Sequence, residues 1–171
     1  YLCSSEHLLP AGHQSAEPVQ RGSGRSLAIL NETLYYKSTT GICSYAGSLP
    51  AGISDSLGEV RYESAVAGTI DNRYYISMKD KGGKYHLFVY DQKTGIWSKE
   101  DNTEALFFCR HEDELYFIDA KDKRMKSVRG TLPYGEGEME GKFPWLVESG
   151  NIGYSMVDNK YVSRINVRVS L

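Results

Sequence analysis

The sequence has few of the features that mark a particular chemistry. Its three cysteines, Cys3, Cys43 and Cys109, are widely spaced and form no Cys-x-x-Cys pair, which argues against a disulfide framework or a zinc site and favours reduced structural thiols. None of the four histidines belongs to an HxH, HxxxH or HExxH arrangement, and the chain has no GxSxG motif, P-loop or calcium loop. The sequence therefore identifies no catalytic, cofactor-binding or metal-binding residue.

An excess of one charge and a long apolar run are also missing. The 171 residues carry 20 Lys and Arg against 22 Asp and Glu, spread along the chain, so the net charge of −2 gives no electrostatic signal of nucleic-acid binding. No apolar run approaches the roughly 18 residues of a membrane span, and no signal peptide is visible. Because the chain begins at Tyr1 without Met and stops inside an expected strand, we expect it to be a piece of a longer polypeptide.

The composition is that of a folded, strand-rich protein. Hydrophobic residues make up 40% and charged residues 25% of the chain, as in an ordinary globular domain, and the 13 tyrosines favour strands over helices. Apolar positions with helical spacing are almost absent. The sequence predicts an all-β fold.

One pattern occurs three times: an apolar run, a polar turn and a strand with two adjacent aromatic residues. The aromatic pairs begin at Tyr35, Tyr74 and Tyr116, which lie 39 and 42 residues apart. This period is the length of one β-propeller blade, a small sheet that must stack on its neighbours to bury its faces. Because adjacent strand residues face opposite sides, each pair should place one ring in each space between blades, which favours core packing over a stacking platform for sugars or bases.

A two-residue polar turn precedes each aromatic strand, at residues 31–32, 71–72 and 112–113. Short polar side chains suit a tight hairpin there. The third turn lies within residues 110–113, an Arg-His-Glu-Asp run that resembles a chemical cluster and is interpreted as a solvated turn. His86 falls within an expected strand, where a packed or half-exposed histidine is the favoured interpretation over a metal ligand.

The repeats divide the chain and define the fold class, a partial β-propeller of about three four-stranded antiparallel blades followed by the start of a β-rich C-terminal segment. An open arc of this kind must be completed by missing sequence or by other chains. The loop at residues 48–58 is the longest inside the repeats and the best candidate for a specific binding surface. The expected divisions are 1–26, irregular or the remnant of a preceding blade; 27–130, propeller blades at about 27–62, 63–101 and 104–130; and 131–171, an acidic linker with closing or β-sandwich-like strands.

Two families resemble parts of the chain. Gly82, Gly83, Tyr90 and Trp97 keep the order of the Gly-Gly, Tyr and Trp positions of a kelch-type blade, so the propeller is expected to be kelch-like in style. Most of residues 27–171 resembles the propeller-bearing structural proteins encoded by prophages of gut and clostridial bacteria. The segments that carry this second resemblance are residues 40–50, 72–78, 87–91, 96–97, 100–101, 145–153 and 160–164.

The prophage resemblance implies a non-catalytic virion component at the neck, the tail or the packaged-DNA stabilising assembly. Its expected partners are other virion or assembly proteins and further copies of itself, without cofactor or membrane contact, and its expected location is the virion or the bacterial cytoplasm during assembly. Two alternatives stay open from the residues: a carbohydrate-binding or glycan-processing propeller of a gut bacterium, and a generic kelch-like interaction module.

Overall fold

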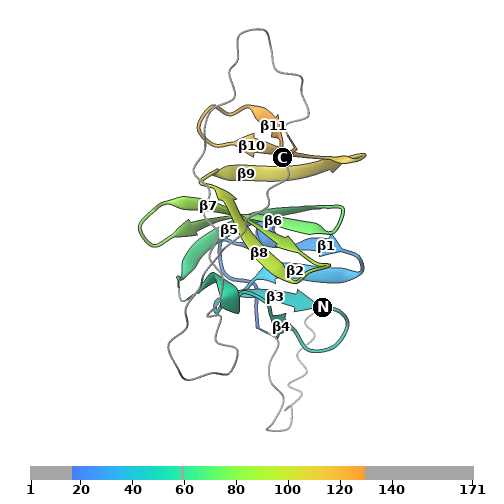
Figure 1. Ribbon diagram of the computed structural model, residues 1–171. Coiled ribbons are helices and arrows are strands. Elements are labelled where there is room, and N and C mark those ends of the chain that lie inside the picture. Colours follow the sequence, from blue (N-terminus) through green and yellow to red (C-terminus); the bar gives the residue numbers. More distant parts are fainter. Residues whose placement is uncertain (1–16, 59, 130–171) are drawn as a thin grey trace, which may run out of the picture. The chain divides into compact units, whose positions relative to one another are not determined.

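The computed structural model describes residues 17–58 and 60–129, which form three antiparallel β-sheets joined in chain order (Figure 1). The predicted all-β fold class is confirmed. Within each sheet every strand pairs with its neighbour in sequence, so each sheet is a meander. The predicted linker and closing strands at 131–171 lie outside the described residues.

The first sheet has four strands: β1 (Ala28–Leu30), β2 (Thr33–Lys37), β3 (Ile42–Tyr45) and β4 (Ala51–Gly52). A short 3₁₀ helix, η1 (Gly24–Ser26), precedes it, and a second, η2 (Asp55–Leu57), follows it. The segment at 48–58, expected to be a loop, thus contains a strand and a helical turn. The sequence does not signal β4 because small residues there pair through their backbone with Cys43 and Ser44 of β3.

The second sheet is the longest and most regular. Its strands are β5 (Tyr62–Ile70), β6 (Arg73–Asp80), β7 (Tyr85–Asp91) and β8 (Ile96–Asp101). Tyr62, placed in the first unit from sequence, begins β5 and pairs with Asp80 of β6. Gly83, in the turn between β6 and β7, has a φ of +83°, a conformation that suits glycine.

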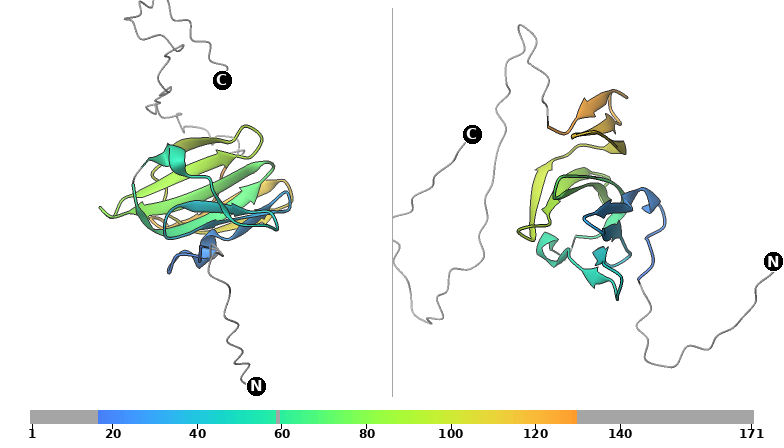
Figure 2. Two further views of the ribbon diagram at one scale, coloured as in Figure 1. Left: turned by 90° about the horizontal axis from the view of Figure 1, so that it is seen from below. Right: turned by 90° about the vertical axis from the view of Figure 1, so that its right-hand side faces the viewer.

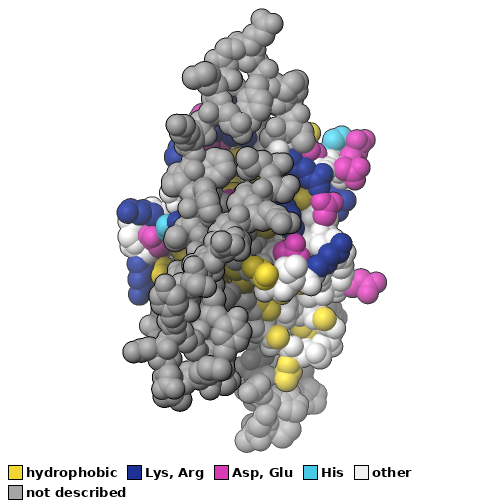
Figure 3. Space-filling view, viewed as in Figure 1, with side chains coloured by type: hydrophobic (Ala, Val, Ile, Leu, Met, Phe, Trp, Pro, Cys, Tyr) yellow, Lys and Arg dark blue, Asp and Glu magenta, His cyan; other side chains and the backbone are white. Residues whose placement is uncertain are grey.

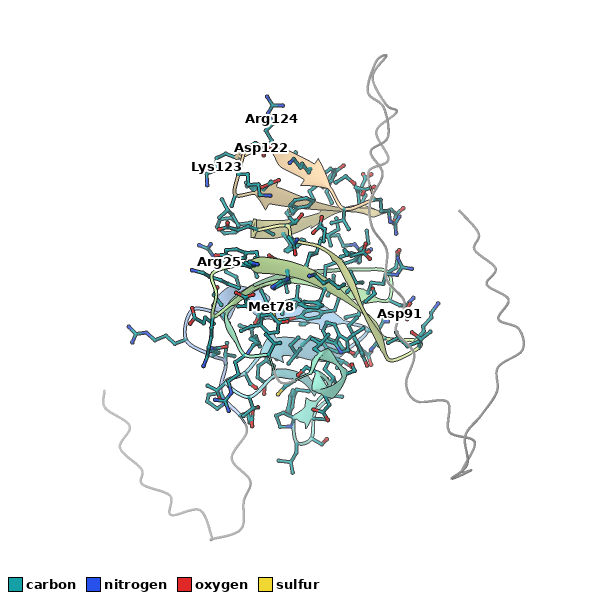
Figure 4. All side chains as sticks on the ribbon, turned by 60° about the vertical axis from the view of Figure 1, so that its left-hand side comes forward. Arg25, Met78, Asp91, Asp122, Lys123 and Arg124 are labelled. Carbon is teal, nitrogen blue, oxygen red and sulfur yellow. The ribbon has the colours of Figure 1, made fainter. Side chains whose placement is uncertain are left out.

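The third sheet has three strands within the described residues: β9 (Ala105–His111), β10 (Glu114–Asp119) and β11 (Met125–Ser127). The turn between β10 and β11 carries Asp122, Lys123 and Arg124, and these side chains extend from the end of the stack of sheets (Figure 4). Lys126 ties this turn together, because its Nζ lies 2.6 Å from Asp119 Oδ2 and 2.9 Å from Asp122 Oδ2.

The three predicted hairpin turns are confirmed. Each joins the first and second strands of a sheet, and its first residue has a positive φ: 46° at Asn31, 51° at Asp71 and 51° at Glu112. Asn and Asp tolerate this left-handed conformation better than most residues because their short side chains bond locally. The repeated backbone geometry shows that the three sheets begin in the same way.

The second sheet lies between the other two and buries both of its faces (Figure 2). We term the side of a sheet that points toward the next sheet along the chain its forward face, and the opposite side its rear face. The first core lies between the first and second sheets and includes Tyr35, Tyr74 and Met78, with Met78 in the interior of the stack (Figure 4). The second core lies between the second and third sheets and includes Tyr75 and Leu115.

The strands that begin each sheet bring the sheets together, since β5 contacts both β1 and β9. The expected packing of the aromatic pairs between sheets is confirmed for Tyr35, Tyr74 and Tyr75, each at most 5% exposed, whereas Tyr36 is 5% exposed outside both cores and its hydroxyl donates to the carbonyl of Glu17. In the second pair, Tyr74 enters one core and Tyr75 the other.

Candidate functional site

The contact between the first and second sheets is built on one tyrosine that meets two others. The ring of Tyr35 on β2 lies 5.3 Å from that of Tyr74 on β6 and 5.8 Å from that of Tyr90 on β7, measured between centroids. The hydroxyl of Tyr74 is buried and donates to the backbone oxygen of Ser26 at 2.8 Å. Burial raises the pKa of Tyr74 far above its usual range. Tyr35 thus marks a forward face, and Tyr74 and Tyr90 mark the rear face that it meets.

In the contact between the second and third sheets a forward tyrosine again packs on the rear face of the next sheet, but the residue that it meets is a leucine. Tyr75 on the forward face of the second sheet shares a buried cluster with Leu115 on the rear face of the third. Gly68 faces the same space, and a Cβ atom there would lie 2.5 Å from Cβ of Phe108 and 3.0 Å from Cδ1 of Leu115. The two sheets approach this closely because position 68 has no side chain.

Both contacts follow one rule, counted from the hairpin turn. The second residue after each two-residue turn faces the rear, and the third faces forward. The second residues are Leu34, Tyr74 and Leu115, and the third residues are Tyr35, Tyr75 and Tyr116. The first and second sheets therefore each offer a forward tyrosine to the rear residue of the next sheet, and Tyr116 has the same register in the third sheet.

This register corrects the alignment drawn from the sequence. The repeat spacing predicts that Tyr35, Tyr74 and Tyr116 are equivalent, but Tyr74 is the second residue after its turn and the other two are the third. The structural equivalent of Tyr35 is Tyr75. A pair of adjacent tyrosines fills both faces whichever register it takes, so the sequence pattern could not reveal the shift.

The rear face of the first sheet carries an apolar row that no described sheet covers. Ile29, Leu34 and Tyr45 lie opposite one another on β1, β2 and β3, and we term this set the rear row. Ile29 is 68% exposed and Tyr45 38% exposed. Hydrophobic side chains are visible at the surface over β3 and β4 of this sheet (Figure 3). The same register of the second sheet contains Tyr74, which is 0% exposed.

The forward face of the third sheet carries a second apolar row. Phe107, Ile118 and Met125 lie opposite one another on β9, β10 and β11, and we term this set the forward row. Phe107 is 47% exposed and Met125 70% exposed. The guanidinium of Arg25, from η1, lies 3.9 Å from the centroid of the Phe107 ring. The same register of the second sheet holds Leu87, which is buried between sheets.

The polar positions singled out from sequence occupy ordinary surface sites. His86 is half-buried in β7, as expected, and its Nε2 lies 2.9 Å from Asp80 Oδ2. Hydrogen bonds from His86 and from the backbone N–H of Lys84 hold the pKa of Asp80 below its usual value. The 110–113 run is exposed at the turn between β9 and β10, where Arg110 Nε donates to the carbonyl of Glu112. Its interpretation as a solvated turn is confirmed.

A buried lysine was not anticipated from the sequence. Lys37, at the end of β2, is 3% exposed, and its Nζ donates to Gln20 Oε1 at 2.8 Å and to the carbonyl of Ser38. Burial lowers the pKa of Lys37. Its side-chain partner Gln20 comes from the chain that precedes the first sheet, so this partner could be found only once the fold had brought residues 17–20 beside β2.

A cavity of about 350 Å³ lies between the second and third sheets. Aromatic side chains of Tyr75 and Phe117 line it together with two arginines. Both guanidinium groups have carboxylate partners within the chain: Arg129 pairs with Asp71, and Arg73 Nε lies 3.9 Å from an oxygen of Asp91. The arginines of this cavity are thus engaged in holding the sheets and turns.

The cysteines and the other possible metal ligands form no site in the part of the chain that the structure describes. Cys43 is buried and Cys109 exposed, and both are free thiols. Among residues 17–58 and 60–129, no three His, Cys, Asp or Glu side chains lie close enough to hold a metal ion together. Neither short helix of this part of the chain is long and apolar enough to cross a membrane. Cys3, His7 and His13 lie outside the described residues.

The two rows are the candidate functional site, because they expose apolar side chains in the registers where the second sheet buries Tyr74 on its rear face and Leu87 on its forward face. Comparisons with known proteins return no match to a protein-family model, a curated protein or a solved structure.

Proposed function

We propose that this chain is a propeller-type scaffold that acts through protein–protein contacts and without catalysis, as a structural or assembly component of a phage virion. The propeller arrangement is supported by the order of the sheets and by the contacts of β5 with β1 and β9, which place the first strands of all three sheets side by side. Strands that gather in this way surround the central channel of a propeller.

One observation carries the proposal for protein contacts. The second sheet buries Tyr74 on its rear face and Leu87 on its forward face, whereas Ile29 and Tyr45 in the rear row and Phe107 and Met125 in the forward row are exposed. Single exposed hydrophobic residues are normal on a protein surface, but rows that repeat the pattern of an internal core mark an interaction surface.

The phage role rests on the sequence resemblance over residues 27–171. A scaffold that presents rigid sheets and turns fits such a role, since a virion component works by holding partners and needs no reacting side chain. The partners of the proposed scaffold are other virion or assembly proteins.

The experiment is to induce phage particles from the bacterial strain that encodes the chain and to purify them on a density gradient. Immunoblotting should find the chain in the particle fractions. A double variant that charges both rows, Ile29→Lys with Met125→Glu, should be lost from the particles. The matched control is Ile96→Lys, which changes an apolar residue of β8 that is 63% exposed and outside both rows, and it should stay with the particles. Absence of the wild-type chain from purified particles would reject the phage role.

A further inference from the structure

The rear row and the forward row lie on the two kinds of sheet face that pack together inside the chain. Inside the chain, a forward tyrosine packs on the rear residue of the following sheet twice: Tyr35 on Tyr74, and Tyr75 with Leu115. Tyr116 on the third sheet has the register of the two forward tyrosines. The first sheet has a rear residue in the same register as Tyr74 and Leu115, and this residue is Leu34. Within residues 17–58 and 60–129, each end sheet therefore lacks the partner that the other could supply.

We propose that a second copy of this chain binds head to tail, with the forward face of its third sheet on the rear face of the first sheet. Tyr116 of one copy then packs against Leu34 and Tyr45 of the other, as Tyr35 packs against Tyr74 and Tyr90 within one chain. This inference rests on the proposed scaffold function, because it names a partner for the same two rows.

The chemistry of the two faces favours a copy of the same chain. Leu34 can take the place that Leu115 has inside the chain. There a forward tyrosine, Tyr75, packs beside a leucine and not beside an aromatic ring. All six side chains of the two rows are apolar or aromatic, so the rows themselves bring no charge into the contact, and the Arg25 guanidinium beside the forward row already lies 3.9 Å from the centroid of the Phe107 ring. The proposed contact thus continues the internal pattern by one more sheet.

The two faces differ, so the contact is heterologous. A two-fold dimer would join identical surfaces, whereas a head-to-tail contact leaves one free end of each kind and produces a closed ring or a longer chain. This difference gives the proposal a signature that simple self-association lacks: a copy with a damaged rear row still has an intact forward row.

The test uses the full 171-residue chain in reducing buffer, because the Cys109 thiol is exposed and could otherwise cross-link copies. Three single variants are compared by size-exclusion chromatography with light scattering: Ile29→Lys in the rear row, Met125→Glu in the forward row, and the control Ile96→Lys. All three positions are more than 60% exposed, so the substitutions leave the cores intact, and circular dichroism verifies that each variant is folded.

The wild-type chain and Ile96→Lys should assemble beyond one copy, and each row variant alone should be a single copy. Mixing the two row variants should restore a species of two copies and nothing larger, because only one intact rear row and one intact forward row can meet. A wild-type chain that stays a single copy at the highest attainable concentration would overturn the proposal. So would row variants that still assemble alone, or a mixture that fails to pair.

The two proposals fail separately. A chain that stays a single copy but is present in purified particles rejects the head-to-tail contact and leaves the virion role in place. A chain that assembles head to tail but is absent from particles rejects the virion role and leaves the contact in place.

Discussion

The side-chain amide of Asn31 donates to Oδ1 of Asn72 at 2.9 Å, joining the first hairpin turn of one sheet to that of the next. The same nitrogen donates to Oε1 of Gln92 at 2.7 Å. A related contact joins the second sheet to the third, where Arg129 pairs with Asp71 and donates to the carbonyl of Asp113. The turns at one end of the sheets are therefore linked across both sheet contacts, and this link fixes how the sheets are aligned.

Removing the Asn31 link should destabilise the protein modestly. Asn31→Gly keeps the left-handed turn conformation and loses both hydrogen bonds, which predicts a loss of about 1 kcal/mol in the free energy of unfolding. Asn31→Ala also places an alanine at a φ of 46°, and it should lose about 1 kcal/mol more. Urea unfolding measures both. Equal stability of Asn31→Ala and Asn31→Gly would show that the backbone conformation contributes nothing.

Gly68→Ala tests how closely the second and third sheets approach. The new Cβ would lie 2.5 Å from Cβ of Phe108, so the sheets must separate, and the expected loss is about 1–3 kcal/mol. Gly52→Ala is the matched control, since Gly52 is also in a strand and a Cβ there meets nothing within 4 Å. Denaturant titration should show a much larger shift for position 68 than for position 52, and similar shifts would contradict the described contact.

Tyr74→Phe tests the buried hydrogen bond between the first two sheets. The substitution keeps the ring and removes the hydroxyl that donates to Ser26, leaving the carbonyl of Ser26 without this donor in the core. The free energy of unfolding should fall by about 1–2 kcal/mol. Tyr45→Phe removes the hydroxyl of a tyrosine that is 38% exposed and should change the stability by less than about 0.5 kcal/mol. A Tyr74→Phe variant as stable as the wild type would mean that this bond is absent in solution.

The hairpin turns of the three sheets could be predicted from the sequence, but which tyrosine of the second sheet is equivalent to Tyr35 could not. The turns at 31–32, 71–72 and 112–113 were identifiable because a tight hairpin demands short polar residues between two apolar strands. The assignment of Tyr75 rather than Tyr74 as the equivalent of Tyr35 was missed, since adjacent tyrosines satisfy both faces in either register.

The contacts that hold the sheets together were also beyond the sequence. Asn31, Asn72 and Gln92 are ordinary turn residues in the sequence, and their hydrogen bonds depend on how neighbouring sheets are placed. The rear and forward rows could be recognised only after pairing had been established, because each row takes one residue from each of three strands.

Acid should weaken the third sheet through Asp119. Its carboxylate accepts from Lys126 Nζ at 2.6 Å and from the backbone N–H of Lys121 at 2.8 Å, and these bonds lower the pKa of Asp119. Because the pKa of Asp119 is lower in the folded chain than in the unfolded chain, its charge stabilises the fold fully at pH values above the unfolded-state pKa of about 3.9. This stabilisation disappears as the pH falls through the folded-state pKa. Asp119→Asn should therefore be less stable than the wild type at pH 7, with the difference shrinking below about pH 4.

The measurement for Asp119→Asn is urea unfolding at a series of pH values between 7 and 3. The control is Asp55→Asn, which replaces an exposed carboxylate of η2, and it should follow the wild-type pH profile. A difference between Asp119→Asn and the wild type that is constant with pH would exclude a role for the charge of Asp119.

The most direct test of the central claim, that the exposed rows of the end sheets bind a second copy of the chain, is sedimentation velocity of the wild-type chain over a wide concentration range. The sedimentation coefficient should rise with concentration for the wild type and for Ile96→Lys, and it should stay constant for Ile29→Lys. A wild-type chain that sediments as a single 19.2 kDa species at every concentration, indistinguishable from Ile29→Lys, would contradict the central claim.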